Sequence, residues 1–348
     1  MSSYISTFSM SSVLLQSVLQ TQQNLATAEQ EVSTGTYANV GTQLGEATSQ
    51  DLTLRNQQSL LQTIETTNNT AATRLSSSQT IMGNLQTTAQ NFLNTLIAST
   101  SQATSGNTLQ SSAQDALQSL VTELNSSVNG EYLFGGINSG VAPITDYYGS
   151  SSSANQTADN NAFSSTFGFS QSSSSVSSIT GAQMQSFLTN QFAPLYQGAN
   201  WTSDWSSASD TTIMSQISNT ETLSTSVSAN QPAFQDLAQA YSMVANLGTQ
   251  NLSADALNTL ISNATTLVQQ GITGLTNLQT NLGLVQNDVT TANTQMSVQM
   301  NILSTQISNL ESVDPYQAST QVTELQTQLE TAYSLTSQIQ KLSLVNYI

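Results

Sequence analysis

Near the end of the chain, residues 322–339 read VTELQTQLETAYSLTSQI. Apolar or small residues recur there at alternating spacings of three and four, at Val322, Leu325, Leu329, Ala332, Thr336 and Ile339. That spacing places one stripe of side chains along a single face of a helix and is typical of coiled coils. The preceding Asp314-Pro315 pair disfavours helix before the proline. We therefore expect a helix over 316–344, which needs a partner to be stable because only one stripe is apolar.

The first residues of the chain provide the matching pattern. A second stripe with the same alternation consists of Leu14, Val18, Thr21, Leu25, Ala28 and Val32. A third keeps nearly this period at Val285, Val289, Ala292, Met296, Met300, Leu303, Ile307 and Leu310. Gly35, Gly41 and Gly45 end the first helix and predict a loop after it. We expect the two ends of the chain to pair with each other, because each carries a stripe that lacks another partner.

The composition excludes several classes of function. The 348 residues are 37% hydrophobic and only 7% charged, with no His and no Cys, and roughly half are Ser, Thr, Asn and Gln. Catalytic triads, cysteine nucleophiles and zinc sites of the usual ligands are therefore excluded. No carboxylate pair or calcium-loop pattern stands out, so we expect no enzyme, no catalytic residue, no metal site and no cofactor.

The charge balance restricts the partners. The net charge is −17, and the only cations are Arg55, Arg74 and Lys341. Nucleic acids and anionic membrane surfaces need several clustered cations, so we expect neither as a partner. No apolar run is long enough to span a membrane, and the N-terminus MSSYISTFSM lacks the features of a cleaved secretory signal. Arg55 and Arg74 could pair with acids of neighbouring subunits or of their own chain, and Lys341 would favour the end of its helix.

These patterns predict a mainly α fold of long antiparallel helices, with coiled-coil pairing of the termini and a small β-containing central insert. Serine runs, Gly, Pro and ten of the 21 aromatic residues between 141 and 212 favour short strands and turns. We expect three domains: 1–40 with 315–348 as the terminal coiled coil, 41–140 with 213–314 as a helical bundle, and 141–212 as a variable β- and loop-rich outer insert.

The residues also resemble a known family. QQNLATAEQEVSTGTYAN (22–39), the segment 275–314 with its Leu282-Gly283 pair, and the C-terminal helix resemble the bacterial flagellin superfamily. GEYLFGG (130–136) is similar to a motif of the hook-associated protein 3 family, the subunits that join flagellar hook and filament. We interpret it as a helix-ending Gly130, a buried strand through Tyr132 and Phe134, and a turn at Gly135-Gly136. The arginines that the family usually carries near residue 31 and near residue 281 are absent, which puts its intersubunit ion pairs in doubt.

This resemblance implies a structural protein of the bacterial flagellum, required for motility. It would leave the cell by type III export without a cleaved signal peptide, with an export chaperone, and would be extracellular at the hook–filament junction. The paired terminal helices would form the inner tube of a homo-oligomeric helical assembly between hook-associated protein 1 and flagellin. The candidate assembly residues are Leu14, Val18, Leu25, Val32, Gly130, Tyr132, Phe134, Gly135, Gly136, Val322, Leu325, Leu329, Ile339 and Leu342.

Two alternatives remain open at the level of sequence. A flagellin filament subunit would carry the same terminal stripes. A surface adhesin or glycan-binding protein would use Trp201 and Trp205 as stacking residues, with Asp204 and Asp210 nearby. A filament subunit should dominate the protein sheared from the cell surface, and an adhesin should lose adhesion, but not motility, when both tryptophans are replaced by alanine.

Overall fold

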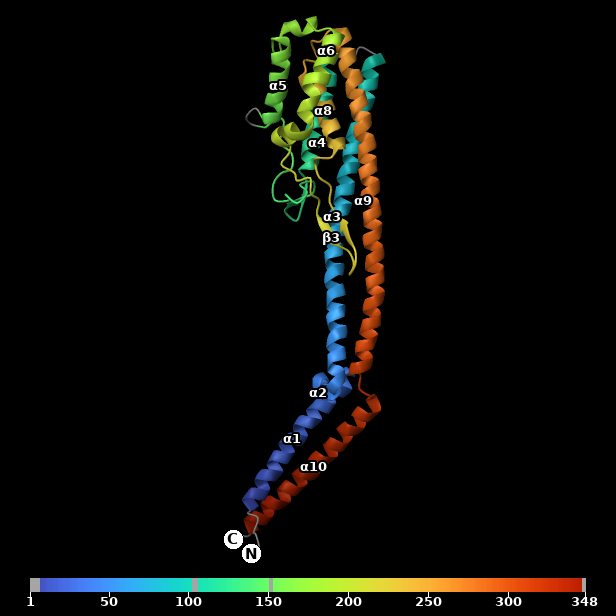
Figure 1. The fold of residues 1–348 in the computed structure, drawn as a ribbon. Coiled ribbons are helices and arrows are strands. Elements are labelled where there is room, and N and C mark those ends of the chain that lie inside the picture. The colour runs from blue at the N-terminus through green and yellow to red at the C-terminus, as the bar shows by residue number, and fades with distance from the viewer. Residues whose placement is uncertain (1–6, 102–105, 150–152, 346–348) are drawn as a thin grey trace. The chain divides into compact units, whose positions relative to one another are not determined.

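The structure is a computed structural model, which describes residues 7–101, 106–149 and 153–345 (Figure 1). It is mainly helical, with two small two-stranded sheets in the middle of the chain, as the stripes predict. Contacts divide the chain into two compact units, residues 1–62 with 296–348 and residues 63–295. The three predicted domain ranges stay a prediction.

The first unit is built from the two ends of the chain. Helix α1 (Thr7–Thr34) packs antiparallel against α10 (Pro315–Val345), as Figure 1 shows in blue and red. A loop with the short helix α2 (Val40–Leu44) and the turn η1 (Gly45–Ala47) leads into α3 (Thr48–Ser101). Helix α9 (Ala254–Glu311) returns, and Asp314 caps α10 because its Oδ1 accepts the N–H groups of Tyr316 and Gln317. The predicted helix boundaries at the two ends are confirmed.

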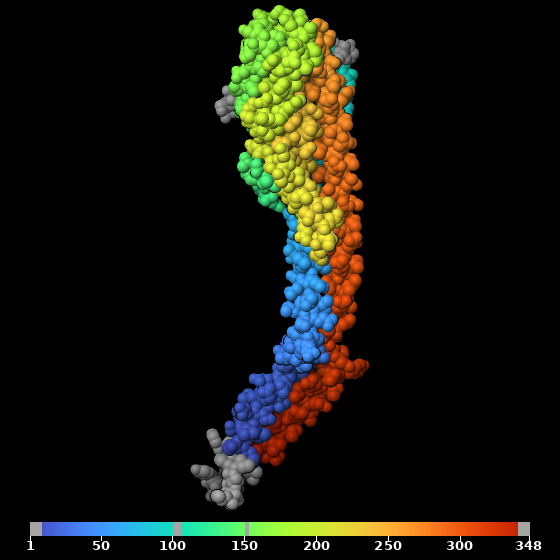
Figure 2. Space-filling model, viewed as in Figure 1, coloured from blue at the N-terminus to red at the C-terminus, as the bar shows by residue number. Residues whose placement is uncertain are grey.

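The second unit, drawn with the first as a space-filling view in Figure 2, contains the rest of α3 and α9 together with α4 (Gly106–Leu124) and α8 (Pro232–Asn246). Helices α4 and α8 pack closely, and most of α8 is buried. The long helices are joined by polar contacts: the amide nitrogen of Asn68, a buried residue, donates to Asn293 Oδ1 and to the carbonyl oxygen of Ile217, each at 2.8 Å. The third stripe faces inward, since Val289, Ala292 and Met296 are buried.

The two sheets lie beside the predicted insert rather than inside it. Strands β1 (Ser127–Val128) and β2 (Glu131–Tyr132) pair antiparallel with Ser127 opposite Tyr132. Strands β3 (Met214–Gln216) and β4 (Thr222–Ser224) pair with Ser215 opposite Leu223.

Within 141–212 the described residues therefore form no strand beyond an isolated antiparallel bridge between Ile144 and Ser206, and the short strands expected there are not found. The described residues form α5 (Ala154–Phe167), α6 (Gly181–Phe187) and α7 (Gly198–Asn200). Short turns connect them, namely η2 (Ser174–Ser178), η3 (Leu188–Phe192), η4 (Ala193–Tyr196) and η5 (Trp201–Trp205). Aromatic content favoured strands locally, but these rings pack into a shared core that short helices build equally well.

Candidate assembly surface

The α1–α10 pair buries its predicted stripes only in part. Val18 and Ala28 of α1 and Ala318 of α10 are the buried apolar residues among the described side chains of the pair. The other described candidates at the helix interface are half-buried, namely Leu14, Leu25, Val322, Leu325, Leu329 and Ile339. Gln22 reinforces the pairing across the chain, because its amide donates to the Tyr333 hydroxyl at 2.6 Å. The stripes therefore lie at the interface between the two helices.

One candidate residue, Val32, does not lie in this interface, and the structure does not describe the side chain of another, Leu342. Val32 is 45% exposed, whereas its neighbour Glu31 is buried and accepts the backbone N–H of Ala38 at 3.1 Å. In the last turn of α1, Glu31 therefore points inward and binds the loop that follows. The alternating spacing of three and four had placed Val32 in that inward position. The side chain of Leu342 lies outside the described residues, as does that of Lys341.

The outer faces of the pair also carry large apolar side chains. Val13 is 65% exposed on α1, and Tyr316 is 88% exposed at the start of α10. The others exposed on these two helices are Met10, Leu15, Leu19, Val32, Tyr333 and Leu335. Single exposed apolar residues are ordinary, but this many on one helix pair indicate a surface made for further contacts.

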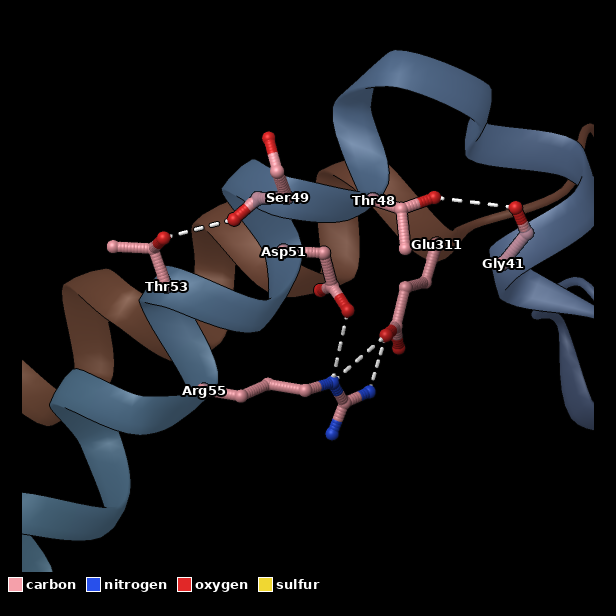
Figure 3. Close-up of polar contacts among 7 residues, drawn as sticks. All are labelled: Gly41, Thr48, Ser49, Asp51, Thr53, Arg55 and Glu311. Atoms are coloured by element: carbon pink, nitrogen blue, oxygen red, sulfur yellow. Dashed lines mark hydrogen bonds and ion pairs between the residues drawn. The ribbon is translucent and has the colours of Figure 1, made fainter.

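Backbone hydrogen bonds hold the loop after α1 to the end of α9, and an ion pair holds the start of α3 to the same place. Tyr37 donates its N–H to the carbonyl of Glu311 at 2.9 Å, and Val313 donates to that of Gly35 at 3.0 Å. Figure 3 shows Arg55 of α3 reaching the carboxylates of Asp51, one turn earlier at 3.2 Å, and of Glu311 on α9. The hydrogen bond to Glu311 raises the pKa of Arg55, with its charge and that of Asp51 acting in the same direction. This three-residue cluster fastens the start of α3 to the end of α9.

The second cation also pairs within the chain. Arg74 donates to Glu131 Oε2 at 3.0 Å and to the carbonyl oxygen of Tyr132 at 2.6 Å. Both arginines therefore bind acids of their own chain, one of the two possibilities left by the sequence. Asp51 was within reach of sequence reasoning, since it precedes Arg55 by four residues on one helix face. Glu311 was not, because 256 residues separate it from Arg55.

The GEYLFGG segment forms a hairpin strand and a tight turn. Helix α4 ends at Leu124, so Gly130 does not end a helix: it follows Asn129 in the two-residue turn between β1 and β2. Both residues have positive φ, 54° and 83°, which is the Asn-Gly turn that favours hairpins. The interpretation of Gly130 as a helix end was wrong, and the Asn129-Gly130 pair was the signal that was overlooked.

The rest of the segment enters the core. Tyr132 is half-buried, Phe134 is fully buried, and the Phe134 carbonyl accepts the N–H of Ala229 at 2.7 Å. Gly135 and Gly136 are buried in the turn that follows. Gly136 has φ 61°, and a Cβ there would lie 2.4 Å from the carbonyl oxygen of Ser209, so a larger residue cannot replace it without a backbone shift.

The tryptophans are inaccessible to a ligand. Trp201 and Trp205 are each 1% exposed and stack on each other with ring centroids 5.5 Å apart. The indole of Trp201 donates to Asn230 Oδ1 at 3.0 Å. The proposal that these rings stack on a glycan is therefore wrong, because the fold uses them as core. Within the described residues, no three acidic side chains converge as a metal site, and no helix is long and apolar enough to cross a membrane.

Comparison with known proteins decides the family. The bacterial flagellin N-terminal helical region matches residues 5–139, and the bacterial flagellin C-terminal helical region matches residues 265–348. The chain belongs to the bacterial flagellin family. This flagellin-family chain is thus a structural, non-enzymatic protein of the flagellum, and the family assembles into extracellular flagellar polymers. The exposed apolar residues of α1 and α10 fall within the two matched regions.

A solved structure shares the fold of this flagellin-family chain. It is a Vibrio parahaemolyticus protein assigned as a flagellar hook-associated protein, with a TM-score of 0.54 and 10% sequence identity. The likeness covers 76% of this chain and 97% of the Vibrio chain. At this identity the likeness concerns the fold alone. A search among curated proteins finds no sequence match.

Proposed function

We propose that the chain is hook-associated protein 3, the junction subunit that connects the flagellar hook to the filament. The observation that carries this proposal is GEYLFGG at 130–136, which resembles the motif of that family. Its hairpin turn, buried Phe134 and tight Gly136 give every part of the motif a structural role. The shared fold with a protein assigned as hook-associated supports the same conclusion.

In this proposal the α1–α10 pairs of many copies form an inner tube. Their exposed apolar side chains, such as Val13 and Tyr316, are covered by neighbouring copies in the assembly. The helices of 41–140 and 213–314 form the surrounding layer, and 141–212 faces outward. The subunit contacts hook-associated protein 1 on one side and flagellin on the other, after type III export with a chaperone and without a cleaved signal peptide.

Deletion of the gene tests the junction role. The mutant should be non-motile, carry hooks without filaments in negative-stain micrographs, and release flagellin monomer into the medium. Restoring the intact chain from a plasmid should recover filaments. Normal filaments on the deletion strain would contradict the proposal.

The alternative within the family is the filament subunit itself, which the matched terminal regions also fit. A filament subunit dominates the protein sheared from the cell surface, whereas a junction subunit is a minor component there. Its deletion would also leave hooks bare, but with no flagellin in the medium. Quantifying sheared and secreted protein therefore separates the two functions.

Replacing either of two alanines of α1 by aspartate tests whether the pairing of α1 with α10 is needed for assembly. Ala28 is 1% exposed between α1 and α10, whereas Ala26 on the same helix is exposed. Ala28→Asp should bury a charge in the pair and fail to restore filaments to the deletion strain, because an unpaired buried carboxylate is costly. Ala26→Asp should restore more motility. If both variants restored motility equally, the proposal that assembly depends on the α1–α10 helix pair would be contradicted.

A further inference from the structure

The aromatic core around α5 encloses a carboxylate. Asp159 is fully buried, and its Oδ2 accepts hydrogen bonds from the hydroxyls of Tyr147, at 2.7 Å, and Tyr196, at 2.8 Å. The Tyr196 hydroxyl also contacts the hydroxyl of Ser242 on α8. Oδ1 of Asp159 has no hydrogen-bond partner among the described residues. One carboxylate thus links the loop before α5, the turn η4 and helix α8.

No positive charge accompanies this carboxylate. Arg74 is the one Lys or Arg in the unit 63–295, and it binds Glu131 and Tyr132. The other ionisable groups that act on the cluster are acids and phenols. They are Asp204 on η5, Tyr148 in the loop before α5, and Asp115 of α4, which acts on Tyr148. Helix α8 carries two further ionisable residues, Asp236 and Tyr241, and neither is a cation. The turn η3 carries no ionisable residue. A buried carboxylate with no cation and one unbonded oxygen favours its neutral, protonated form.

We propose that Asp159 makes the core around α5 a proton-controlled element, which closes tightly when the carboxyl is protonated and loosens when it ionises. The proposal concerns the folding of the unit 63–295 and is independent of the function proposed above. Ionisation places a negative charge in a cluster of phenol and indole rings, where the hydroxyls of Tyr147 and Tyr196 are the two donors to it among the described residues.

The electrostatics of the cluster agree with this geometry. The pKa of Asp159 is raised to about 7, mainly by burial and to a lesser extent by Asp204, while the hydrogen bonds from Tyr147 and Tyr196 offset part of that rise. Burial, with Asp159 alongside, also raises the pKa values of Tyr147 and Tyr196 well above the usual range. Both phenols therefore stay protonated and remain donors over the whole interval in which Asp159 titrates.

The sign of the pH effect follows from the raised pKa. The carboxyl binds its proton more tightly in the folded chain than in the unfolded chain, where its pKa is 3.8. The resulting stability is complete below about pH 4 and is lost as the pH rises to about 7. A difference of one pKa unit between the folded and unfolded chains changes their equilibrium by a factor of ten. The equilibrium constant for unfolding therefore rises by at most about a thousandfold across that interval.

The chain contains its own reporters for this cluster. Trp201 and Trp205 are its only two tryptophans. The Trp205 ring stacks on Tyr147 at 5.5 Å and contacts Tyr196 at 5.2 Å between centroids. Tryptophan fluorescence therefore follows the opening of this core.

The experiment is urea unfolding of the full chain between pH 4 and pH 8, followed by tryptophan fluorescence. In the natural chain the urea midpoint should fall steadily across this range. Asp159→Asn puts an uncharged amide of the same size in place of the carboxyl, so its midpoint should fall much less than that of the natural chain and should stay nearly constant from pH 6 to pH 8. Parallel pH profiles for the natural chain and Asp159→Asn would overturn the proposal.

The matched control is Asp236→Asn. Asp236 is half-buried on α8, and burial raises its pKa to about 6, so it contributes a smaller effect of the same sign. This variant should keep most of the fall in midpoint. Loss of the fall in Asp236→Asn, with its retention in Asp159→Asn, would overturn the proposal.

A direct titration keeps the proposal testable if Asp159→Asn does not fold. Carboxyl ¹³C resonances of the natural chain should include one aspartate that titrates with a midpoint near 7. Tyr147→Phe should move that midpoint to higher pH, because it removes a donor to the ionised form. If the Asp236→Asn chain shows no carboxyl that titrates above about pH 5, the proposal is overturned.

Discussion

Helix α8 and helix α1 are both amphipathic in sequence, but they end in different environments. Eleven of the 15 residues of α8 are buried by the rest of the chain. On α1 the buried apolar residues among the described side chains are Val18 and Ala28, while Val13, Leu15 and Leu19 are about half exposed or more. Helix α8 is enclosed by other parts of its own chain, whereas α1 packs mainly against α10 in the part of the chain that the structure describes.

The two helices differ in how much apolar surface each buries within the single chain: α8 buries most of its side chains, and the α1–α10 pair buries few of those described. Burial of apolar surface is the main favourable term in folding, so α8 and its neighbours account for much of the stability of the single chain. A pair of long helices with one half-buried stripe is marginal in isolation. The exposed apolar residues lie on this pair, and the chain belongs to a family that assembles into flagellar polymers.

The strongest test of the contrast removes an aromatic ring from the core beside α8. Phe234 is fully buried and meets Phe134 edge-on, with ring centroids 5.6 Å apart. Phe234→Ala should lower the free energy of unfolding by about 3–5 kcal/mol, as measured by urea and tryptophan fluorescence. Val13→Ala, at a 65% exposed position on α1, should change it by less than about 0.5 kcal/mol. Similar losses in both variants would break the comparison.

One substitution made in both helices compares them directly. Val244 on α8 is fully buried, and Val18 on α1 is 9% exposed in the less covered pair. Val244→Ala should cost about 2 kcal/mol, from two lost methyl groups and the cavity that remains. Val18→Ala should cost less than about 1 kcal/mol in the free chain, seen as faster amide hydrogen exchange within α1. If Val18→Ala lowered the free energy of unfolding as much as Val244→Ala, the α1–α10 interface would be as well packed in the free chain as the core around α8.

Removing the ion pair between Arg55 and Glu311 at the end of α9 should lower the free energy of unfolding by less than the core substitutions do. The Arg55 side chain is half exposed, so solvent screens its attraction to Asp51 and Glu311. Arg55→Met should cost about 1 kcal/mol or less and speed hydrogen exchange at Tyr37, whose N–H binds the Glu311 carbonyl. Arg55→Lys should retain part of the protection. Unchanged exchange in Arg55→Met would show that the backbone bonds suffice.

The smallest expected change in the free energy of unfolding is a gain, and it concerns Tyr241. The hydroxyl of Tyr241 on α8 is buried without a hydrogen-bond partner among the described residues, and burial raises its pKa beyond its usual range. Its ring meets Phe92 edge-on at 5.2 Å. Tyr241→Phe keeps that ring and removes the unpaired hydroxyl, so it should leave stability unchanged or raise it by up to about 1 kcal/mol. A clear loss in urea unfolding would reveal a partner for the hydroxyl.

Local patterns allowed much of the helical frame to be predicted. The helix expected over 316–344 is α10, Pro315–Val345, because Asp314-Pro315 sets its start and the alternating spacing continues to its end. The same spacing identified the face of α9 that contains Val289 and Met296. Asn129-Gly130 was an equally local signal for the first hairpin, and it was overlooked in favour of a helix end.

The amino-acid sequence by itself determined that this chain consists of long helices with paired ends and has no His or Cys chemistry. Periodicity, proline positions and composition are properties of neighbouring residues and need no tertiary contact. Only the tertiary structure decided that Arg55 binds Glu311, that the two tryptophans are core, and that Asp159 lies buried between two tyrosines. These outcomes depend on residues far apart in the chain, whose approach is fixed by the packing of the whole core and not by any local pattern.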